Sequence, residues 1–517
     1  MKKYLLLLFS LISFASCVED EGNYDYKESR NLTTVGIEQF YKLTVGESQV
    51  LTPKIIERYD KNEKEIEGAK IEWFINDEFV TEGPSYTFVA EKNGKYQFNL
   101  KIEDPKTKSI STNTFDIRVQ SAYIQGFVIL SELEGKSALS FLRTKWFNRP
   151  DTVVYTDDYL RVFEKHNNQE SLLKEPIMIT ENLKNEYTDL CGEIGVLTRE
   201  GNNYSLQYLN GESLARETHV QQEFEGEELP ANWHPKQMLH TIWDSFVLNE
   251  DGKVYIRREG SGEAFHTGVF SKDITLWNNN KFERLFFSDY ARTDALMAIE
   301  VTPEGKRQYV GIRNKVWSAD YNLGRIDISG DYTDEFTNLK DEILFADWRR
   351  GDYDENGLSV AQKTPADEYV LHCFNTGYVG NRSKTIPVEY SIKINLTKEI
   401  GITNVTGLCT SKAKNFTYIA DDHSLYAVNN YKEHETWNKM HTFDKKIVSI
   451  CDQSTFMSYS DYKVALAIGF EDGSIEVWEI NDEMPNIFNK KVYTSKNTFG
   501  KIKQILYKCG RPGNYLN

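Results

Sequence analysis

One stretch of the sequence has the residue types of a calcium-binding loop. In GDYDENG, Asp352, Asp354 and Asn356 alternate before a glycine, in the order D-x-[DN]-x-[DN]-G. Their oxygens suit a hard cation such as calcium, and glycine permits the sharp turn that the loop needs. The bidentate glutamate that completes such a loop is replaced by Lys363. A calcium site and an ordinary acidic turn that ends in Asn-Gly therefore both remain open.

Aromatic residues in polar segments are the candidates for ligand binding. Trp233 and His234 lie in NWHP, within a polar insertion between two apolar hairpins, and Trp277 lies in a similar loop. A sugar ring or an apolar peptide side chain can stack on such residues. Packing inside the fold is the competing explanation for each of them.

Catalytic motifs are incomplete in this sequence. HETWN begins like a zincin helix, but Asn438 occupies the place of the second zinc-binding histidine. EGKS ends like a phosphate-binding loop, but Leu130 occupies the place of its first glycine. The sequence contains no G-x-S-x-G, and its many carboxylates cannot be paired by counting. We therefore predict that the protein is not an enzyme and that, calcium apart, it has no cofactor.

The composition favours strands and argues against a nucleic-acid partner. The 517 residues include 30 Tyr and 28 Phe but only 12 Pro, which is typical of an all-β protein. The formal net charge is -17, and no cluster of Lys and Arg is present to bind a phosphate backbone. Because the chain is too long for one ordinary globular domain, we expect at least two.

The N-terminus has the features of a secretory signal. Two lysines precede an apolar run from Leu5 to Phe14, and small residues lead up to Cys17. This run is too short to span a bilayer of about 30 Å, and no later segment offers about 20 apolar residues in a row. We therefore expect the rest of the chain to be water-soluble and outside the cytoplasm.

The end of this signal, FASC, resembles a bacterial lipobox. The resemblance implies that residues 1–16 are a signal peptide, cleaved before Cys17, and that the Cys17 thiol carries a covalent lipid. Each buried acyl methylene contributes about 0.8 kcal/mol, so several chains on one cysteine anchor a protein stably. A cysteine that merely ends a cleaved signal is the alternative.

Residues 17–30 are polar and acidic, and we expect them to form an extended tether because they cannot build a core. The acidic run after Cys17 also resembles the export signal of lipoproteins displayed outside the outer membrane. That resemblance implies a protein that is lipid-anchored in the outer membrane and faces the medium. A solubilising spacer on a protein that faces the periplasm remains the alternative.

Residues 31–120 alternate between apolar and polar side chains, which predicts short half-buried strands. GKYQFNLKIED places Phe98, Leu100 and Ile102 on one face, and Trp73 in IEWFIN is predicted to lie in the core. Such strands with turn signals predict an immunoglobulin-like β-sandwich. EWFIN, SYTF and GKYQFNLKIED also resemble the PKD-like domain, a small extracellular β-sandwich.

Residues 121–517 repeat an apolar strand, a tight polar turn and a second apolar strand. Asp251-Gly252 and Asp472-Gly473 are strong hairpin signals. Repeated sheets of this kind stack radially, which predicts a β-propeller of seven blades, with eight as the alternative. GFEDGSIEVWEI resembles the inner hairpin of a WD40-type blade. The seven candidate repeats begin near residues 124, 193, 245, 297, 367, 416 and 464.

Lipobox, acidic tether, sandwich and propeller together resemble the PKD-like family lipoproteins, whose typical opening is similar to CVEDEGNYDY. Such lipoproteins are found beside Sus-type uptake systems, in which a substrate-binding lipoprotein caps a TonB-dependent transporter. The resemblance implies a non-catalytic accessory that binds or presents an oligosaccharide or peptide to that transporter. Two alternatives remain open: a glycan- or peptide-degrading surface enzyme that uses the propeller funnel, and a purely structural or adhesive component of the complex.

Replacing Cys17 by Ser is expected to release the protein from membranes, because the thiol is the attachment point of the lipid. Fractionation of cells that express Cys17→Ser, with Ser16→Ala as the control that keeps the cysteine, measures the effect. Retention of Cys17→Ser in the membrane fraction would contradict lipidation at this residue.

Overall fold

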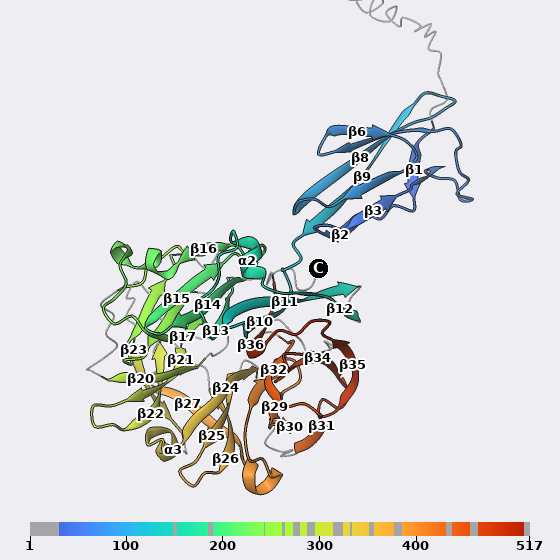
Figure 1. Ribbon diagram of the computed structural model, residues 1–517. Helices are drawn as coiled ribbons and strands as arrows, with labels where there is room; N and C mark the ends of the chain where they lie inside the picture. The colour runs from blue at the N-terminus through green and yellow to red at the C-terminus, as the bar shows by residue number, and fades with distance from the viewer. Residues whose placement is uncertain are drawn as a thin grey trace, which may run out of the picture. The chain divides into compact units, whose positions relative to one another are not determined.

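The structure is a computed structural model, and Figure 1 shows its strands and short helices. Strands make up nearly all of its regular structure, which confirms the all-β prediction. The chain divides into two compact units, Met1–Gln120 and Ser121–Asn517. Within the described part, no helix is long and apolar enough to cross a membrane. The described residues are 30–147, 152–184, 190–241, 243–260, 264–271, 280–286, 295–313, 324–330, 333–350, 356–376, 385–430, 437–454 and 464–510.

The first unit contains one five-stranded sheet and two strand pairs. The sheet has the order β2-β9-β8-β5-β6, and the pairs are β1-β4 and β3-β7. All pairings are antiparallel except that of β2 with β9. The strands are β1 (Leu32–Val35), β2 (Phe40–Thr44), β3 (Ser48–Leu51), β4 (Lys54–Glu57), β5 (Lys70–Ile75), β6 (Glu78–Glu82), β7 (Tyr86–Val89), β8 (Gly94–Glu103) and β9 (Ile110–Gln120).

The core of this unit follows the predicted alternation. Trp73, Phe98, Leu100 and Ile102 are fully buried in one apolar cluster, which confirms their assignment to the core. The Trp73 indole N–H donates to the carbonyl of Gly83 at 2.9 Å, so its single polar atom is satisfied inside the core.

Arg30, the last residue of the predicted tether, contacts the first unit. It donates to both carboxylate oxygens of the buried Asp104, at 2.7 and 2.8 Å. This bidentate pair lowers the pKa of Asp104 to about 2, because the guanidinium stabilises the ionised form. Arg30 therefore belongs to the folded unit.

The second unit consists of strands that pair mainly with their neighbours along the chain. In chain order these strands are β10 (Gly126–Leu133), β11 (Lys136–Phe147) and β12 (Thr152–Tyr159); β13 (Glu175–Asn182), β14 (Glu193–Glu200), β15 (Asn203–Leu209) and β16 (Arg216–His219); β17 (Pro235–His240), β18 (Asp244–Asn249) and β19 (Val254–Arg258); β20 (Lys281–Phe286), β21 (Ala295–Val301), β22 (Arg307–Arg313) and β23 (Gly324–Ser329); β24 (Glu342–Arg350), β25 (Asn356–Lys363), β26 (Tyr369–Thr376) and β27 (Thr385–Asn395); β28 (Gly407–Thr410), β29 (Phe416–Ala420), β30 (Ser424–Asn429) and β31 (Trp437–Thr442); β32 (Ile447–Asp452), β33 (Ala465–Phe470), β34 (Ile475–Ile480) and β35 (Phe488–Thr494); and β36 (Lys501–Lys508). The strands of each group pair antiparallel, and β36 joins the sheet of β10, β11 and β12. A parallel pairing of β23 with β27 joins two of the four-stranded groups into one sheet of eight strands.

The few helices are short and lie between these strands. They are α2 (Val162–His166), η1 (Val220–Glu223), η2 (Glu225–Glu227), α3 (Thr333–Thr337) and η3 (Leu396–Ile400).

The sheets are arranged radially, as in a β-propeller (Figure 1). The first strand of each sheet contacts the first strand of the next, in the order β13, β17, β20, β24, β28 and β32. The last strand, β36, contacts both β32 and β13 and so completes this ring. It also pairs with β10, in the sheet that contains β10, β11 and β12. The two ends of the unit thus share one sheet, which closes the ring without a free edge.

Neighbouring inner strands form no backbone ladder with each other in the described ranges, and side chains connect them instead. Gln504 on β36 donates to the carbonyl of Ile179 on β13 at 3.0 Å and accepts from its N–H at 2.9 Å. Gln237 on β17 makes the same two bonds with Leu285 on β20, at 2.7 and 2.9 Å. These amides satisfy strand-edge groups that would otherwise be left unpaired.

The predicted hairpins are present. Asp251-Gly252 connects β18 to β19, and Asp472-Gly473 connects β33 to β34, as the turn residues indicated. The Gly135-Lys136 pair of EGKS lies at the turn between β10 and β11, not before a helix. The repeat predicted near residue 367 begins at β26, whereas the hairpin in the structure begins one strand earlier, at β25.

Replacing Gly473 by Ala is expected to destabilise the second unit more than replacing Gly305 by Ala. Both glycines have left-handed backbones, with φ of +80° and +82°, so each alanine costs about 1 kcal/mol. A Cβ at Gly473 would also lie 2.5 Å from the carbonyl oxygen of Gly500, whereas nothing lies within 4 Å of a Cβ at Gly305. We expect a total cost of about 2–4 kcal/mol at Gly473.

Urea unfolding of the two full-length variants measures this difference. Equal losses would show that the Gly473 turn is free to move away from Gly500, contrary to the packing described.

Candidate functional site

The inner strands of the propeller surround a cavity of about 600 Å³. Residues from β13, β17, β20, β24, β28, β32 and β36 all line it, so the cavity is the central channel of the ring. Its size lies within the range of sites that hold a small molecule. The channel is the place in the second unit where side chains from every sheet converge.

One wall of the channel carries a charged pair beside an aromatic ring. Asp347 and Trp348 lie in β24, and Lys412 follows β28. The Lys412 ammonium lies 2.6 Å from an Asp347 carboxylate oxygen and 4.9 Å from the centroid of the Trp348 ring. The side chains of Lys412 and Asp347 are 9% and 27% exposed, so both charges remain open to the channel. This pair can recognise hydroxyl, carboxylate or amide groups of a ligand.

Asp347 and Lys412 are held in place by neighbouring backbone. The Thr410 N–H donates to the Asp347 carboxylate at 2.8 Å. The Thr410 hydroxyl accepts from the Lys412 ammonium at 2.6 Å. The Lys412 N–H donates to the Ser454 hydroxyl at 2.6 Å. These bonds orient the charged side chains before any ligand arrives, which lowers the entropy cost of binding.

Asp452, at the end of β32, is a buried carboxyl group in the same channel. Burial raises its pKa to about 7, although the hydrogen bonds of Ser454 and the charge of Lys412 act in the opposite direction. The Ser454 N–H donates to its Oδ1 at 2.7 Å, while Oδ2 has no hydrogen-bond partner within the described residues. Asp452 therefore exchanges its proton near neutral pH.

Two cysteines also line the channel. Burial raises the pKa of the Cys409 and Cys451 thiols well above their usual range, so both are protonated and weakly nucleophilic. No disulfide joins the cysteines in the described part of the chain.

Trp233 and His234, two of the predicted aromatic candidates, do not line the channel. Trp233 is 7% exposed and packs against Phe224 and Tyr255, with centroids at 5.2 and 5.5 Å, so its ring faces are not open to a ligand. His234 is half-buried and packs on Tyr204 at 5.1 Å. Trp277 lies outside the described residues.

The predicted calcium loop lies only partly within the described residues, so the calcium site stays a prediction. Asn356 begins β25, which runs to Lys363 and pairs with β24. The Lys363 ammonium pairs with Asp367 at 2.5 Å. Asp352 and Asp354 lie outside the described residues, as does Cys17.

No sequence motif indicates Asp347, Lys412 and Asp452 as site residues. They lie on three different sheets, with about 65 and 40 residues between them, and no motif connects them. An alternation of apolar and polar residues marks a strand but does not show which strand ends meet in a channel.

A PKD-like family model matches residues 17–176. The match confirms the PKD-like domain and extends beyond Gln120 into the strands that open the second unit. A search of curated protein sequences finds no match.

Solved structures with similar folds have very low sequence identity. A quinonprotein alcohol dehydrogenase-like protein from Bacteroides thetaiotaomicron is 10% identical, over 93% of this chain and 100% of its own, with a TM-score of 0.35. The Cps50 (Swd1) β-propeller domain of Myceliophteria thermophila is 9% identical, over 69% and 97%, with a TM-score of 0.39. Hsv2 of Kluyveromyces lactis is 8% identical, over 72% and 99%, with a TM-score of 0.40. These similarities say nothing about what this chain binds.

Replacing Asp452 by Asn is expected to remove a pH dependence of stability. Because the pKa rises from about 3.8 to about 7 on folding, the native protein holds a proton that the unfolded chain has lost. The wild-type free energy of unfolding should therefore fall, relative to Asp452→Asn, by about 1.4 kcal/mol per pH unit between pH 4 and 7. The difference should level off above pH 7.

Urea unfolding at pH 4.5 to 8 measures this slope. Asp472→Asn is the control of opposite sign: although desolvation acts against the ionised form, Lys445 and Ser474 lower the pKa of the exposed Asp472 to about 2, so its contribution is lost only in acid below this pH range. A wild-type profile parallel to that of Asp452→Asn would exclude a neutral Asp452.

Proposed function

We propose that this protein is a non-catalytic accessory of a Sus-type uptake system, lipid-anchored through Cys17 in the outer membrane and facing the medium. In this proposal it binds an oligosaccharide or peptide and presents it to a TonB-dependent transporter and that transporter's substrate-binding lipoprotein. The PKD-like match over residues 17–176 and the lipobox-like FASC support the assignment to this class of lipoprotein.

The architecture that we propose for this role is an immunoglobulin-like sandwich followed by a seven-bladed propeller. The two-layered core of the first unit supports the sandwich, since the five-stranded sheet and both strand pairs contribute to it. The ring of inner strands, from β13 to β36, supports seven blades. In this scheme the last blade combines β36 with β10, β11 and β12.

The observation that carries the binding role is the composition of the channel wall. The Asp347–Lys412 pair is partly open, so it offers a donor and an acceptor within a few ångströms, beside the largely buried ring of Trp348. Sugars and peptides present the complementary groups. Holding such a ligand at the membrane raises its effective concentration at the transporter.

Replacing Lys412 by Met is expected to weaken ligand binding by about 10- to 100-fold, because one charge-assisted hydrogen bond is lost. Titration calorimetry with a panel of defined oligosaccharides and short peptides first identifies a ligand and then compares variants. Lys412→Arg should keep part of the affinity, and Lys490→Met, on the outer strand β35, should keep all of it. Equal binding by wild type and a folded Lys412→Met would exclude the channel wall.

The partner is tested separately, with the intact lipidated protein. Capture from outer membranes followed by mass spectrometry should recover a TonB-dependent transporter and its lipoprotein. Recovery of neither, with the lipidated protein intact, would contradict the uptake role. Recovery of both, from a protein that binds nothing in the panel, would favour the purely structural role.

One observation favours an enzyme as the second candidate. A carboxyl group that titrates near neutral pH, as Asp452 does, is what a general acid requires, and Asp347 is a second carboxylate in the same channel. A glycan- or peptide-degrading enzyme would form product from the panel, and Asp452→Asn would abolish it. Substrate that is bound and recovered intact supports the accessory role.

A further inference from the structure

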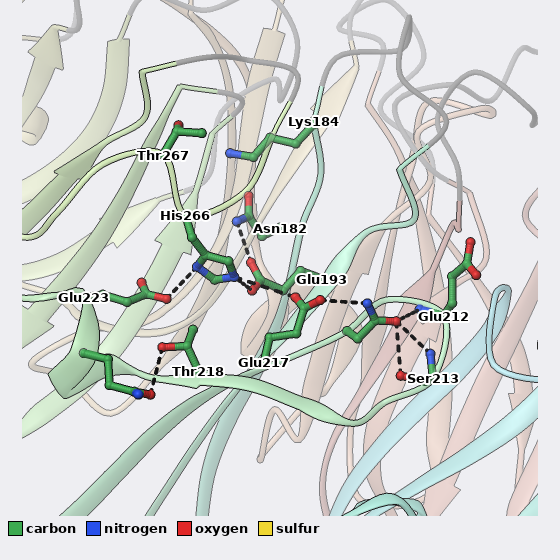
Figure 2. A network of polar contacts seen from close by, with 12 residues as sticks. Asn182, Lys184, Glu193, Glu212, Ser213, Glu217, Thr218, Glu223, His266 and Thr267 are labelled. Carbon is green, nitrogen blue, oxygen red and sulfur yellow. Dashed lines mark hydrogen bonds and ion pairs between the residues drawn. The ribbon is translucent and has the colours of Figure 1, made fainter.

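A second polar cluster lies in the propeller away from the channel lining, and His266 is at its centre (Figure 2). The histidine–glutamate cluster consists of His266, Glu193, Glu217 and Glu223. The His266 Nε2 atom lies 2.6 Å from a Glu193 oxygen and 3.7 Å from a Glu217 oxygen. Its Nδ1 atom lies 2.6 Å from a Glu223 oxygen. Both ring nitrogens thus face carboxylates.

The four residues come from different elements. Glu193 begins β14, Glu217 lies in β16, Glu223 ends η1, and His266 lies in the segment after β19. A ligand shared by these side chains would connect an interior strand and an edge strand of one sheet to the segment that follows the next sheet.

The orientation of each side chain is fixed by a second contact. The Asn182 amide donates to Glu193 at 3.0 Å, and the Asn210 amide donates to Glu217 at 2.7 Å (Figure 2). With Glu223 at Nδ1, the ring directs Nε2 toward Glu193 and Glu217. A carboxylate on one imidazole nitrogen, with the other nitrogen among further ligands, is the usual outer contact of a metal-bound histidine.

Carboxylates outnumber lysine and arginine side chains around the cluster. Glu223 and Glu259 are paired with the buried cations Arg257 and Lys184, at 2.9 Å from Arg257 to Glu259 and 3.4 Å from Lys184 to Glu259. Glu193 and Glu217 are the two carboxylates in excess. A protonated His266 would neutralise only one of them, whereas a divalent cation would neutralise both.

Two buried groups beside the cluster lack hydrogen-bond partners in the described part of the chain. They are the hydroxyl of Tyr208 and the Nε2 atom of His240, and both residues are fully buried. The Tyr208 ring contacts the rings of both His240 and His266, each at 5.7 Å. A buried hydroxyl without a partner costs about 1–3 kcal/mol, so a further occupant, such as a metal-bound water, is expected at this place.

We propose that Glu193, Glu217 and His266 bind one Zn²⁺ ion that connects β14 and β16 to the segment after β19. One donor atom of each residue lies within 4.8 Å of the other two, and the set of one imidazole nitrogen and two carboxylate oxygens suits Zn²⁺. Tetrahedral ligands lie roughly 3.4 Å apart, so Nε2 and Glu193 must separate slightly on binding. The fourth position is left for water.

Calorimetric titration of the full chain, after treatment with a chelator, tests the site with ZnCl₂ and, separately, CaCl₂ and MgCl₂. We expect one Zn²⁺ per chain and no comparable binding of Ca²⁺ or Mg²⁺. Glu217→Gln and His266→Gln should each weaken Zn²⁺ binding by more than about 100-fold. The matched controls are Glu225→Gln, an exposed acid near the cluster, and His234→Gln, and both should bind as the wild type does.

Three outcomes would overturn the proposal: no stoichiometric Zn²⁺ binding, binding that Glu217→Gln and His266→Gln both leave intact, or tighter binding of Ca²⁺ or Mg²⁺. Near-ultraviolet circular dichroism checks that each variant is folded. Should His266→Gln fail to fold, Glu217→Gln decides alone, because its side chain is 35% exposed and its loss leaves no cavity in the core. Neither Lys412 nor the transporter enters this test, so it fails or succeeds independently of the proposed function.

Discussion

The propeller depends on how the free edges of its inner strands are satisfied. An inner strand pairs with its own sheet on one side only, and its other edge presents backbone groups to the next sheet. Side chains bind across these junctions: Gln237 joins β17 to β20, Arg284 joins β20 to β24, and Gln504 joins β36 to β13. These bonds satisfy polar backbone groups at the junctions where they form, on the side that faces the channel.

The same constraint determines which side chains line the channel. Asp347 accepts from the N–H of Thr410 on the next strand, so a residue that closes one junction also presents a charge to the cavity. Ser454 likewise binds the Lys412 N–H and the Asp452 carboxylate. The structural contacts and the proposed ligand contacts thus involve the same residues, and for that reason conservative substitutions are needed to separate them.

The channel and the histidine–glutamate cluster differ in how their charges are compensated. In the channel, Lys412 and Asp347 neutralise each other while remaining partly exposed, which suits reversible contact with a ligand. In the cluster, the fully buried Glu193 makes no ion pair with a lysine or arginine within the described residues, and its nearest charged group is the imidazole of His266. A permanent cation suits the second environment, because removing an unpaired charge from water is costly.

The sequence by itself determined the local structure: alternation placed Trp73, Phe98 and Leu100 in the core, and Asp-Gly pairs marked the hairpin turns, since both signals act over a few residues. It did not determine the sites. The indole of Trp233 is buried although it lies in a polar segment, and Asp347, Lys412 and Asp452 meet only because distant strands end at one channel. Which strand ends meet is decided by closure of the ring, a long-range condition that no short motif records.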